Sequence, residues 1–177
     1  MGSSSEITIE TNGYRVKLDS ERASAKFDMI GILSQTQVTS RELCSAIRPV
    51  RIIVELFLFT GGRLPYALVG GLFTPGEGEN LDIRVHLSAD VVCDLENPIK
   101  RAGLAREFAE PLMVGLLEEL PVDDLPAGEL VVDRGVYDEL ESSAMSFRMA
   151  GRLLRSTTAA LLHNRDIESA VRYAIAR

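Results

Sequence analysis

Two adjacent serines, Ser142 and Ser143, come closest in this chain to a catalytic arrangement. A serine becomes a nucleophile when a neighbouring base removes its proton and a third group orients that base. No histidine lies near the pair in the sequence. A serine at the start of a helix has a second role, because its oxygen accepts a free backbone N–H of the first turn. We therefore interpret both serines as helix caps and predict no enzymatic activity.

Acidic residues are the next candidates for chemistry, since carboxylates bind hard cations. Four of them are close together in the sequence: Glu118, Glu119, Asp123 and Asp124. They lack the ordered spacing and the glycine of a calcium loop, and we interpret them as a solvated turn. The chain also lacks the Gly-x-x-x-x-Gly-Lys-Ser/Thr loop that holds nucleotide phosphates. We predict no metal, no cofactor and no GTPase activity.

Three arginines, Arg148, Arg152 and Arg155, recur at the spacing of one helix face. They form either a solvated face or a surface that contacts RNA or an acidic partner. The net charge of −7 argues against a general nucleic-acid coat, because phosphate binding rests on Lys and Arg. Residues 107–141 contain eleven acids and one base, so the charge is unevenly placed. Such polarity can orient a partner.

The bulk composition is that of an ordinary globular domain: 177 residues, 46% hydrophobic and 25% charged. No apolar run reaches the roughly 18 residues of a membrane span, and no signal peptide is visible. Cys44 and Cys93 lack the spacing of a zinc or redox pair, so we expect free thiols. These features predict a cytoplasmic protein without a membrane partner.

The elements that position the candidate residues follow from periodicity and turn signals. Asn12-Gly13 predicts a hairpin over Ile7–Leu18, whereas Ser20–Gln37 is too mixed to assign. The remaining expected elements are a short helix at Arg41–Ile47, strands at Arg51–Phe59, Tyr66–Phe73, Leu81–Leu87 and Leu130–Val132, and helices at Gly103–Leu120, from Ser142 or Ser143 to Leu162, and at Asp166–Ala176. Pro111 should either delay the start of the first long helix or kink it.

From residue 51 the predicted order is three strands, a helix, a strand and a helix. Strands that precede helices in this way favour a two-layer α+β sandwich with the helices on one face of the sheet. We divide the chain into residues 1–50, a hairpin and short helix that extend the sheet or form a dimerisation arm; residues 51–163, the sandwich; and residues 164–177, a C-terminal helix.

Three local patterns on these elements resemble domain IV of bacterial translation elongation factor G, which tetracycline-resistance ribosomal protection factors share. The first is a Gly-Gly-Arg-x-x-Tyr turn after a core strand, formed here by Gly61, Gly62, Arg63 and Tyr66. The second is a Glu-aromatic pair followed by a glycine, at Glu107, Phe108 and Gly115. The third is a strand–helix junction, matched by Gly135, Tyr137, Ser142, Ser143, Phe147 and Ala150.

The resemblance covers about residues 51–162 and implies a split βαβ sandwich with a left-handed crossover. In that family the turn and the junction loop form a tip that enters the ribosomal decoding site beside transfer RNA. The family's junction histidine is replaced by Asp138 and its next aspartate by Glu141, while Leu64 and Pro65 make the turn stiffer and more apolar. Negative charge at Asp138 disfavours contact with phosphate.

Two functional hypotheses follow, and both describe a non-catalytic binding domain. In the first, the domain associates with the ribosome or another RNA. The residues expected to make contact are Gly61, Gly62, Arg63, Tyr66, Tyr137, Asp138, Ser142, Ser143, Arg148, Arg152 and Arg155. In the second, the protein is a protein–protein adaptor or regulatory subunit that kept the fold and lost the RNA-contacting tip. Homo-oligomerisation through residues 7–50 is a further alternative, and an enzyme with a small-molecule pocket is the weakest hypothesis.

Overall fold

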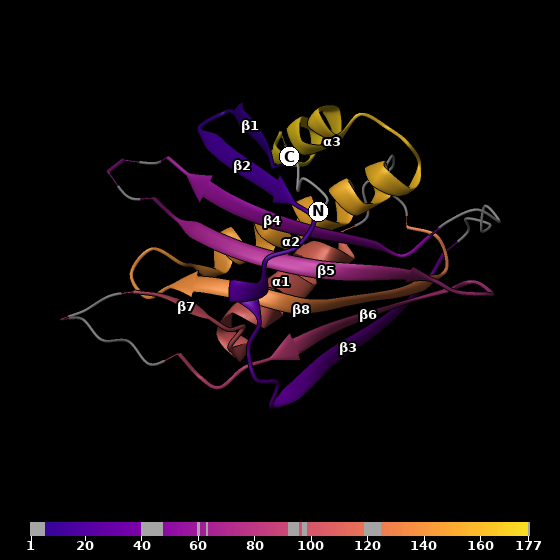
Figure 1. Cartoon of the computed structure of the whole chain (residues 1–177), viewed down its shortest axis with the longest axis horizontal. Helices are drawn as coiled ribbons and strands as arrows, with labels where there is room; N and C mark the ends of the chain where they lie inside the picture. The colour runs from indigo at the N-terminus through magenta and orange to yellow at the C-terminus, as the bar shows by residue number, and fades with distance from the viewer. Residues whose placement is uncertain are drawn as a thin grey trace.

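The sheet has eight strands in the part of the chain that the computed structural model describes, which is residues 6–39, 48–59, 61–62, 64–91, 96, 99–118 and 125–176 (Figure 1). The strands are β1 (Ile7–Thr11), β2 (Tyr14–Asp19), β3 (Gly31–Val38), β4 (Val50–Leu58), β5 (Tyr66–Pro75), β6 (Asn80–Leu87), β7 (Lys100–Ala102) and β8 (Gly128–Asp138). The helices are α1 (Arg106–Leu117), α2 (Ala144–Leu162) and α3 (Ile167–Ile175), with a short 3₁₀ turn, η1 (Ala23–Ala25). The predicted helix at Arg41–Ile47 lies outside the described residues.

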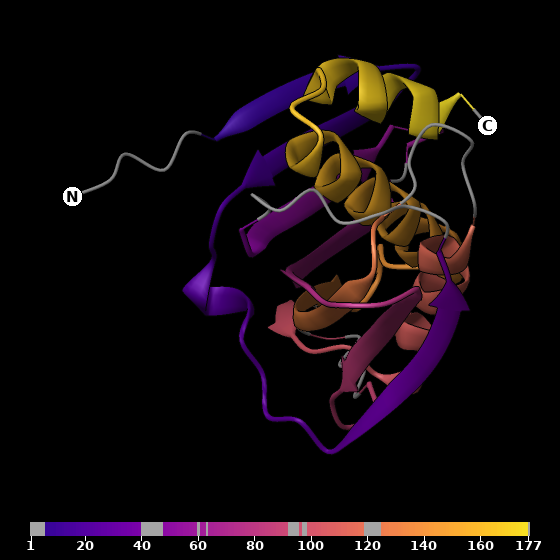
Figure 2. The same cartoon turned by 90° about the vertical axis from the view of Figure 1, so that its right-hand side faces the viewer.

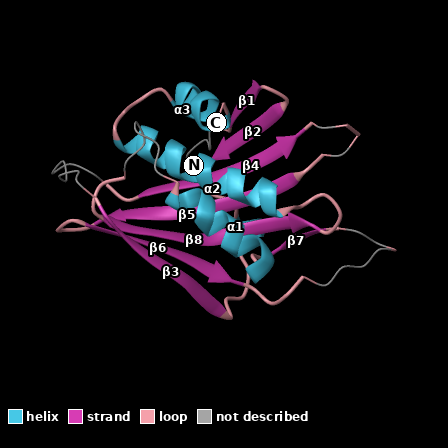
Figure 3. Cartoon of the chain, turned by 180° about the vertical axis from the view of Figure 1, so that it is seen from behind, coloured by secondary structure: helices cyan, strands magenta, loops and turns pink. Residues whose placement is uncertain are grey.

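The strands are ordered β1-β2-β4-β5-β8-β6-β3, with β7 beside the end of β8. Within this sheet the segment from β4 to α2 has the predicted order of elements except that the short strand β7, which was not predicted, precedes α1, and β6 and β8 are its parallel pair. In Figure 3, which shows the helical side, β6 points to the right, β8 lies above it, and α1 lies in front. The connection from β6 through α1 to β8 is therefore left-handed, the rare alternative to the usual rule. The predicted α+β sandwich is confirmed.

The central strands form because their apolar residues suit a sheet buried on the helical side. β6 alternates Leu81, Ile83, Val85 and Leu87, all buried, with Asp82, Arg84 and His86 on the other face. β5 runs through Gly70-Gly71, where its register with β8 shifts. A side chain at Gly70 would overlap Ile53 and Arg134, so the sheet needs a glycine there.

The two long helices pack closely because each has a glycine at the contact. A Cβ at Gly115 of α1 would overlap the carbonyl oxygen of Arg148, and one at Gly151 of α2 would overlap that of Leu112. The helix α1 begins at Arg106 and continues through Pro111, so the first of the two alternatives for Pro111, a start delayed to about Ala109, is wrong. The apolar residues at helical spacing in this segment, Leu104 just before the helix and Phe108, Leu112 and Leu116 within it, are buried, and Leu120 lies outside the described residues.

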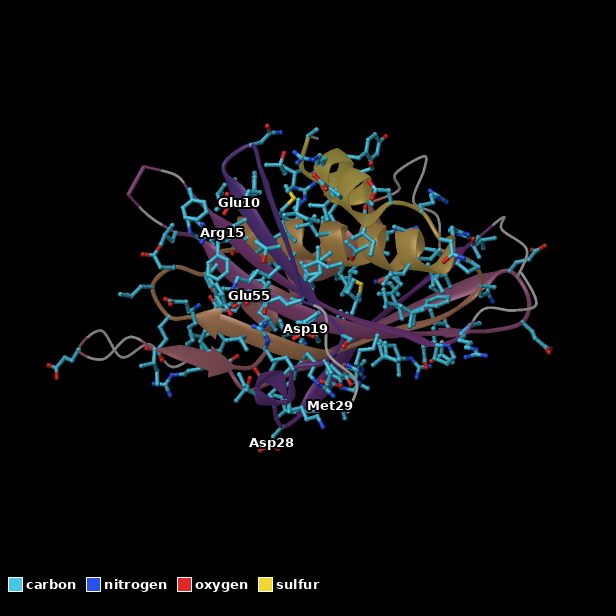
Figure 4. All side chains as sticks on the ribbon, turned by 45° about the horizontal axis from the view of Figure 1, so that its top comes forward. Glu10, Arg15, Asp19, Asp28, Met29 and Glu55 are labelled. Carbon is cyan, nitrogen blue, oxygen red and sulfur yellow. The ribbon has the colours of Figure 1, made fainter. Side chains whose placement is uncertain are left out.

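The N-terminal residues extend the sheet at both edges. Asn12 and Gly13 both have positive φ, and the hairpin they form adds β1 and β2 beside β4. The chain then crosses the sheet to its opposite edge, where β3 pairs with β6. We call the crossing segment, residues 20–30, the strap. Figure 2 shows it on the face of the sheet opposite the helices, and Figure 4 labels Asp19 at its start and Asp28 and Met29 near its end.

The strap covers a second, smaller core. Ala25 of η1 is fully buried against Ile53, Tyr66 and Leu68. On the helical side, the predicted C-terminal helix is α3, which has Asp166 as its N-cap and buries Val171 and Ala174. Ile167 is partly buried against the main core.

Candidate binding site at one end of the sheet

The β4–β5 turn (residues 59–66) and the β8–α2 loop (residues 138–143) lie together at one end of the sheet, and we call them the tip (Figure 1). The N–H of Tyr66 donates to the carbonyl of Glu141 at 3.1 Å, and the N–H of Leu64 donates to its carboxylate, also at 3.1 Å. The hydroxyl of Ser142 donates to the carbonyl of Tyr66 at 2.7 Å. The structure therefore joins two segments that are about 75 residues apart in the chain, and these are the two for which the resemblance implies a shared tip.

The polar groups of the β8–α2 loop hold the loop itself. Asp138 accepts the N–H groups of Leu140 and Glu141, each at 3.0 Å, and its own N–H donates to the Ser142 hydroxyl at 2.8 Å. Ser143 is the N-cap of α2, in a reciprocal capping box with Ser146. The predicted cap is confirmed for Ser143, whereas Ser142 bridges the loop to β5. The replacement at Asp138 thus supplies a carboxylate that closes a turn.

Both tyrosines predicted as contact residues are buried. The Tyr66 hydroxyl donates to Glu55 at 2.9 Å, and Lys100 lies 3.6 Å from the centre of its ring. Burial and the Glu55 carboxylate raise the pKa of Tyr66, so the hydroxyl stays protonated. Tyr137 packs against Phe108, with ring centres 5.5 Å apart. The prediction that these two side chains contact a partner is therefore wrong. Both are packed in the interior next to the tip.

Three large apolar side chains of the tip are exposed to solvent. Leu64 is 46% exposed and Leu140 is 51% exposed, and Phe59 at the end of β4 is similarly open. Gly61 and Gly62 have positive φ, and among the described residues a Cβ added at either one would meet no atom within 4 Å. The predicted Arg63 lies outside the described residues.

The three predicted arginines have separate roles in packing the helices. Arg155 is 3% exposed and donates to the carbonyl of Leu116 at 2.7 Å and to Gln37 at 2.8 Å. Arg152 pairs with Glu118 and donates to the Ala174 carbonyl of α3. Arg148, which also pairs with Glu118, is the only one of the three that is exposed. The interpretation as one basic contact stripe is wrong, because α1 and α3 pack on both sides of the series.

Glu118 is the acid that joins these arginines. Burial alone would raise its pKa, but hydrogen bonds and attraction from Arg148 and Arg152 outweigh burial and lower the pKa. A carboxylate held between two guanidinium groups stabilises the α1–α2 contact, and the hydrogen-bonding capacity of Glu118 is used within that contact. Of the four acids predicted to form a solvated turn, only Glu118 belongs to the described residues.

Glu55 and Lys100 are supporting residues that sequence reasoning missed. Glu55 is the one acid in the apolar run Arg51–Phe59, and a lone charge in a buried strand is a signal for a specific partner. Its partners are Tyr66 and Arg22. Lys100 belongs to β7, which pairs with only three residues of β8 and has no periodic pattern of its own. No signal in the sequence marks that strand.

Within the described residues, no group of three or more histidine, cysteine, aspartate or glutamate side chains is placed to hold a metal ion. Cys44 and Cys93 lie outside those residues. None of the described helices combines the length and the hydropathy that crossing a bilayer requires. The geometry defines a two-layer α+β sandwich whose tip exposes Phe59, Leu64 and Leu140 beside an acidic loop. The sequence matches no protein-family model and no curated protein. The resemblance to elongation factor G domain IV stays a prediction.

Proposed function

We propose that this chain is a non-enzymatic binding domain that acts as an adaptor, with the tip as its contact surface for another protein. The observation that carries the proposal is the exposure of Phe59, Leu64 and Leu140 at one end of the molecule. Large apolar side chains gathered at an open surface are typical of protein contacts. The hydroxyls and the Asp138 carboxylate of the same tip are taken up by the loop's own hydrogen bonds.

The charge of the tip also favours a protein over RNA. Asp138, Glu139 and Glu141 lie in one short loop, and Arg101 is paired with Glu139. Phosphate contact depends on available cations, and two of the three helix arginines are engaged between helices. An acidic loop with apolar neighbours suits a protein surface that is apolar at its centre and basic at its rim.

Site-specific photocrosslinking tests this proposal directly. A photoreactive amino acid is placed at Leu64 or Leu140 in growing cells, with Val114 of α1 as a control of equal exposure on another surface. We expect a discrete protein adduct at both tip positions, absent at Val114 and lost when Phe59→Asp is added. Adducts to RNA at the tip, or the same adducts at Val114, would contradict the proposal.

Association with the ribosome is the second candidate function, and the strand order with its left-handed crossover favours it. Co-sedimentation with ribosomes at low and moderate salt tests it, because phosphate contacts weaken steeply as salt rises. The exposed Arg148→Glu should weaken co-sedimentation, whereas the exposed Arg172→Glu on α3 should leave it unchanged. Failure to sediment with ribosomes at low salt would remove this candidate.

A further inference from the structure

Among the described residues, the strand β3 forms an edge of the sheet. Among the described strands it pairs only with β6, through an unbroken register from Gly31 to Val38. Its eight residues, GILSQTQV, contain no charge and no proline. Natural edge strands usually carry lysine, proline or a bulge, because an open row of N–H and C=O groups is a template for another strand. At the opposite edge, β1 contains Glu10, and α3 packs against it.

The hydrogen-bonding groups of β3 that face away from β6 belong to its even-numbered residues. At one end of the strand Ile30 donates to the carbonyl of Leu87, and at the other Thr39 donates to the carbonyl of Glu79. The carbonyls of odd-numbered β6 residues therefore point toward β3, and the register pairs them with odd-numbered β3 residues. Bonding alternates along an antiparallel strand, so residues 32, 34, 36 and 38 direct their N–H and C=O groups outward.

The side chains of β3 are divided between the two faces of the sheet. Gln37 donates to the carbonyl of Leu117 in α1, which places the odd-numbered side chains on the helical face. The even-numbered ones lie on the opposite face, where Thr36 donates to Asp82. Two of these are apolar and open to solvent, Ile32 at 47% and Val38 at 77% exposed.

The even-numbered residues of the strand, whose side chains lie on the face opposite the helices, are symmetric about Gln35 in chemical type, whereas Leu33 and Gln37 on the helical face differ. Ser34 and Thr36, both hydroxyl residues, lie one position to either side, and Ile32 and Val38, both β-branched and apolar, lie three positions to either side. A two-fold axis perpendicular to the sheet keeps the helices of both copies on one face and requires even-numbered residues to face even-numbered ones. An axis through Gln35 meets this requirement and places each isoleucine opposite a valine.

We propose that the protein forms a dimer in which β3 pairs antiparallel with β3 of a second copy, with the two-fold axis at Gln35. Ile32 then faces Val38 of the partner subunit, Ser34 faces Thr36 of the partner subunit, and the outward N–H and C=O groups of both strands bond to each other. The self-matching pattern is what selects a second copy of this chain as the occupant. Dimerisation leaves the tip open and does not depend on the adaptor proposal.

Sedimentation equilibrium over about two decades of protein concentration is the first measurement, because an edge contact of this size gives a concentration-dependent dimer. We expect the mass to rise toward twice that of the chain. Added salt should strengthen the dimer or leave it unchanged, because β3 is uncharged while each chain carries a net charge of −7. A monomer at every concentration, or a dimer that dissociates as salt is added, would overturn the proposal.

Complementary charges test the register. A chain with Ile32→Lys and Val38→Lys places like charges opposite each other, and so does a chain with Ile32→Glu and Val38→Glu. We expect each alone to dimerise at least about tenfold more weakly than the wild type, and a mixture of the two to form a heterodimer. Thr8→Lys on the other edge strand is the matched control and should dimerise normally. If the folded variants fail to associate when mixed, the register is wrong.

A cysteine at the axis gives an independent readout in a chain with Cys44 and Cys93 replaced by serine. The two copies of residue 35 would form a non-hydrogen-bonded pair with Cα atoms about 4.5 Å apart, within the range of a disulfide. Gln35→Cys should therefore crosslink under mild oxidation. Ser34→Cys is the control, because its two copies lie diagonally at roughly 7–8 Å. Equal crosslinking of the two variants would overturn the axis at Gln35.

Discussion

The two faces of the sheet are held by different physical means. The helical face buries a continuous apolar core, in which Phe108 and Phe147 stack with ring centres 4.6 Å apart. The strap face has a small apolar cluster surrounded by ion pairs: Glu21 and Asp133 with Arg51 and Arg134, and Glu55 with Arg22. Burial of hydrocarbon is non-directional, whereas each ion pair fixes one geometry. The helical face therefore contributes most of the stability, and the strap face holds one particular segment in place.

Removing an aromatic ring from the helical face should have the largest effect on folding. Phe147 is fully buried between α1 and α2, and Phe147→Ala should lower the free energy of unfolding by about 3–5 kcal/mol through lost burial and a residual cavity. Urea unfolding followed by circular dichroism measures this loss. Met145→Ala, on the exposed side of the same helix, is the control and should change stability by less than about 0.5 kcal/mol. A similar loss in both variants would show that the core is not where the stability lies.

Breaking the ion pairs of the strap face should cost less but act more locally. Glu55→Ala leaves the Tyr66 hydroxyl and the Arg22 guanidinium without their partner, and should lower stability by about 1–3 kcal/mol. Limited proteolysis should then cut within residues 20–30 sooner than in the wild type.

The matched control for this change is the exposed ion pair of Glu10 and Arg15, which Figure 4 shows near the hairpin turn, apart from Glu55. Glu10→Ala should change stability by at most about 0.5 kcal/mol, because water screens the pair. If Glu10→Ala and Glu55→Ala proved equally mild, the strap would be held by Ala25 and its apolar neighbours alone.

The helical face could be predicted from the sequence because burial leaves a periodic signal. An element that packs on the core must have one apolar side. That side is visible within a few neighbouring residues, as the alternation of Leu81–Leu87 and the helical spacing of apolar residues in α2 show. The hairpin was equally local, since Asn12-Gly13 determines its own turn. Of the tip, the sequence predicted the Ser143 cap on the same grounds.

The strap face could not be predicted, because its contacts join residues that are far apart in the chain. Glu21 and Arg134 lie 113 positions apart, and no sequence pattern around either residue identifies the other as its partner. β3 has one strand partner, and none of its side chains is fully buried. Its sequence therefore lacks the apolar alternation that identifies a strand. For the arginine series, the spacing placed the residues on one helix face but could not show that α1 and α3 pack against it. The open, apolar tip needed the fold for the same reason.

Low pH should weaken the ion pairs of the strap face and leave the apolar core of the helical face unaffected, and this is the smallest of the expected effects. Burial alone would raise the pKa of Asp133, but hydrogen bonds and attraction from Arg51 and Arg134 outweigh it, so the pKa is lowered on folding. A carboxyl with a lowered pKa stabilises the fold above its unfolded pKa of 3.8, and that contribution is lost as the pH falls through the folded value. Asp133→Asn should therefore lower the free energy of unfolding by about 1 kcal/mol at pH 7 and by progressively less below about pH 4, so that the stability curves of the variant and the wild type converge in acid.

Glu110→Gln, in an exposed pair on α1, is the control and should follow the wild-type curve throughout. Urea unfolding from about pH 6 to pH 2 makes the measurement, and a constant gap between Asp133→Asn and the wild type would mean that the charge of Asp133 contributes nothing to holding the strap face.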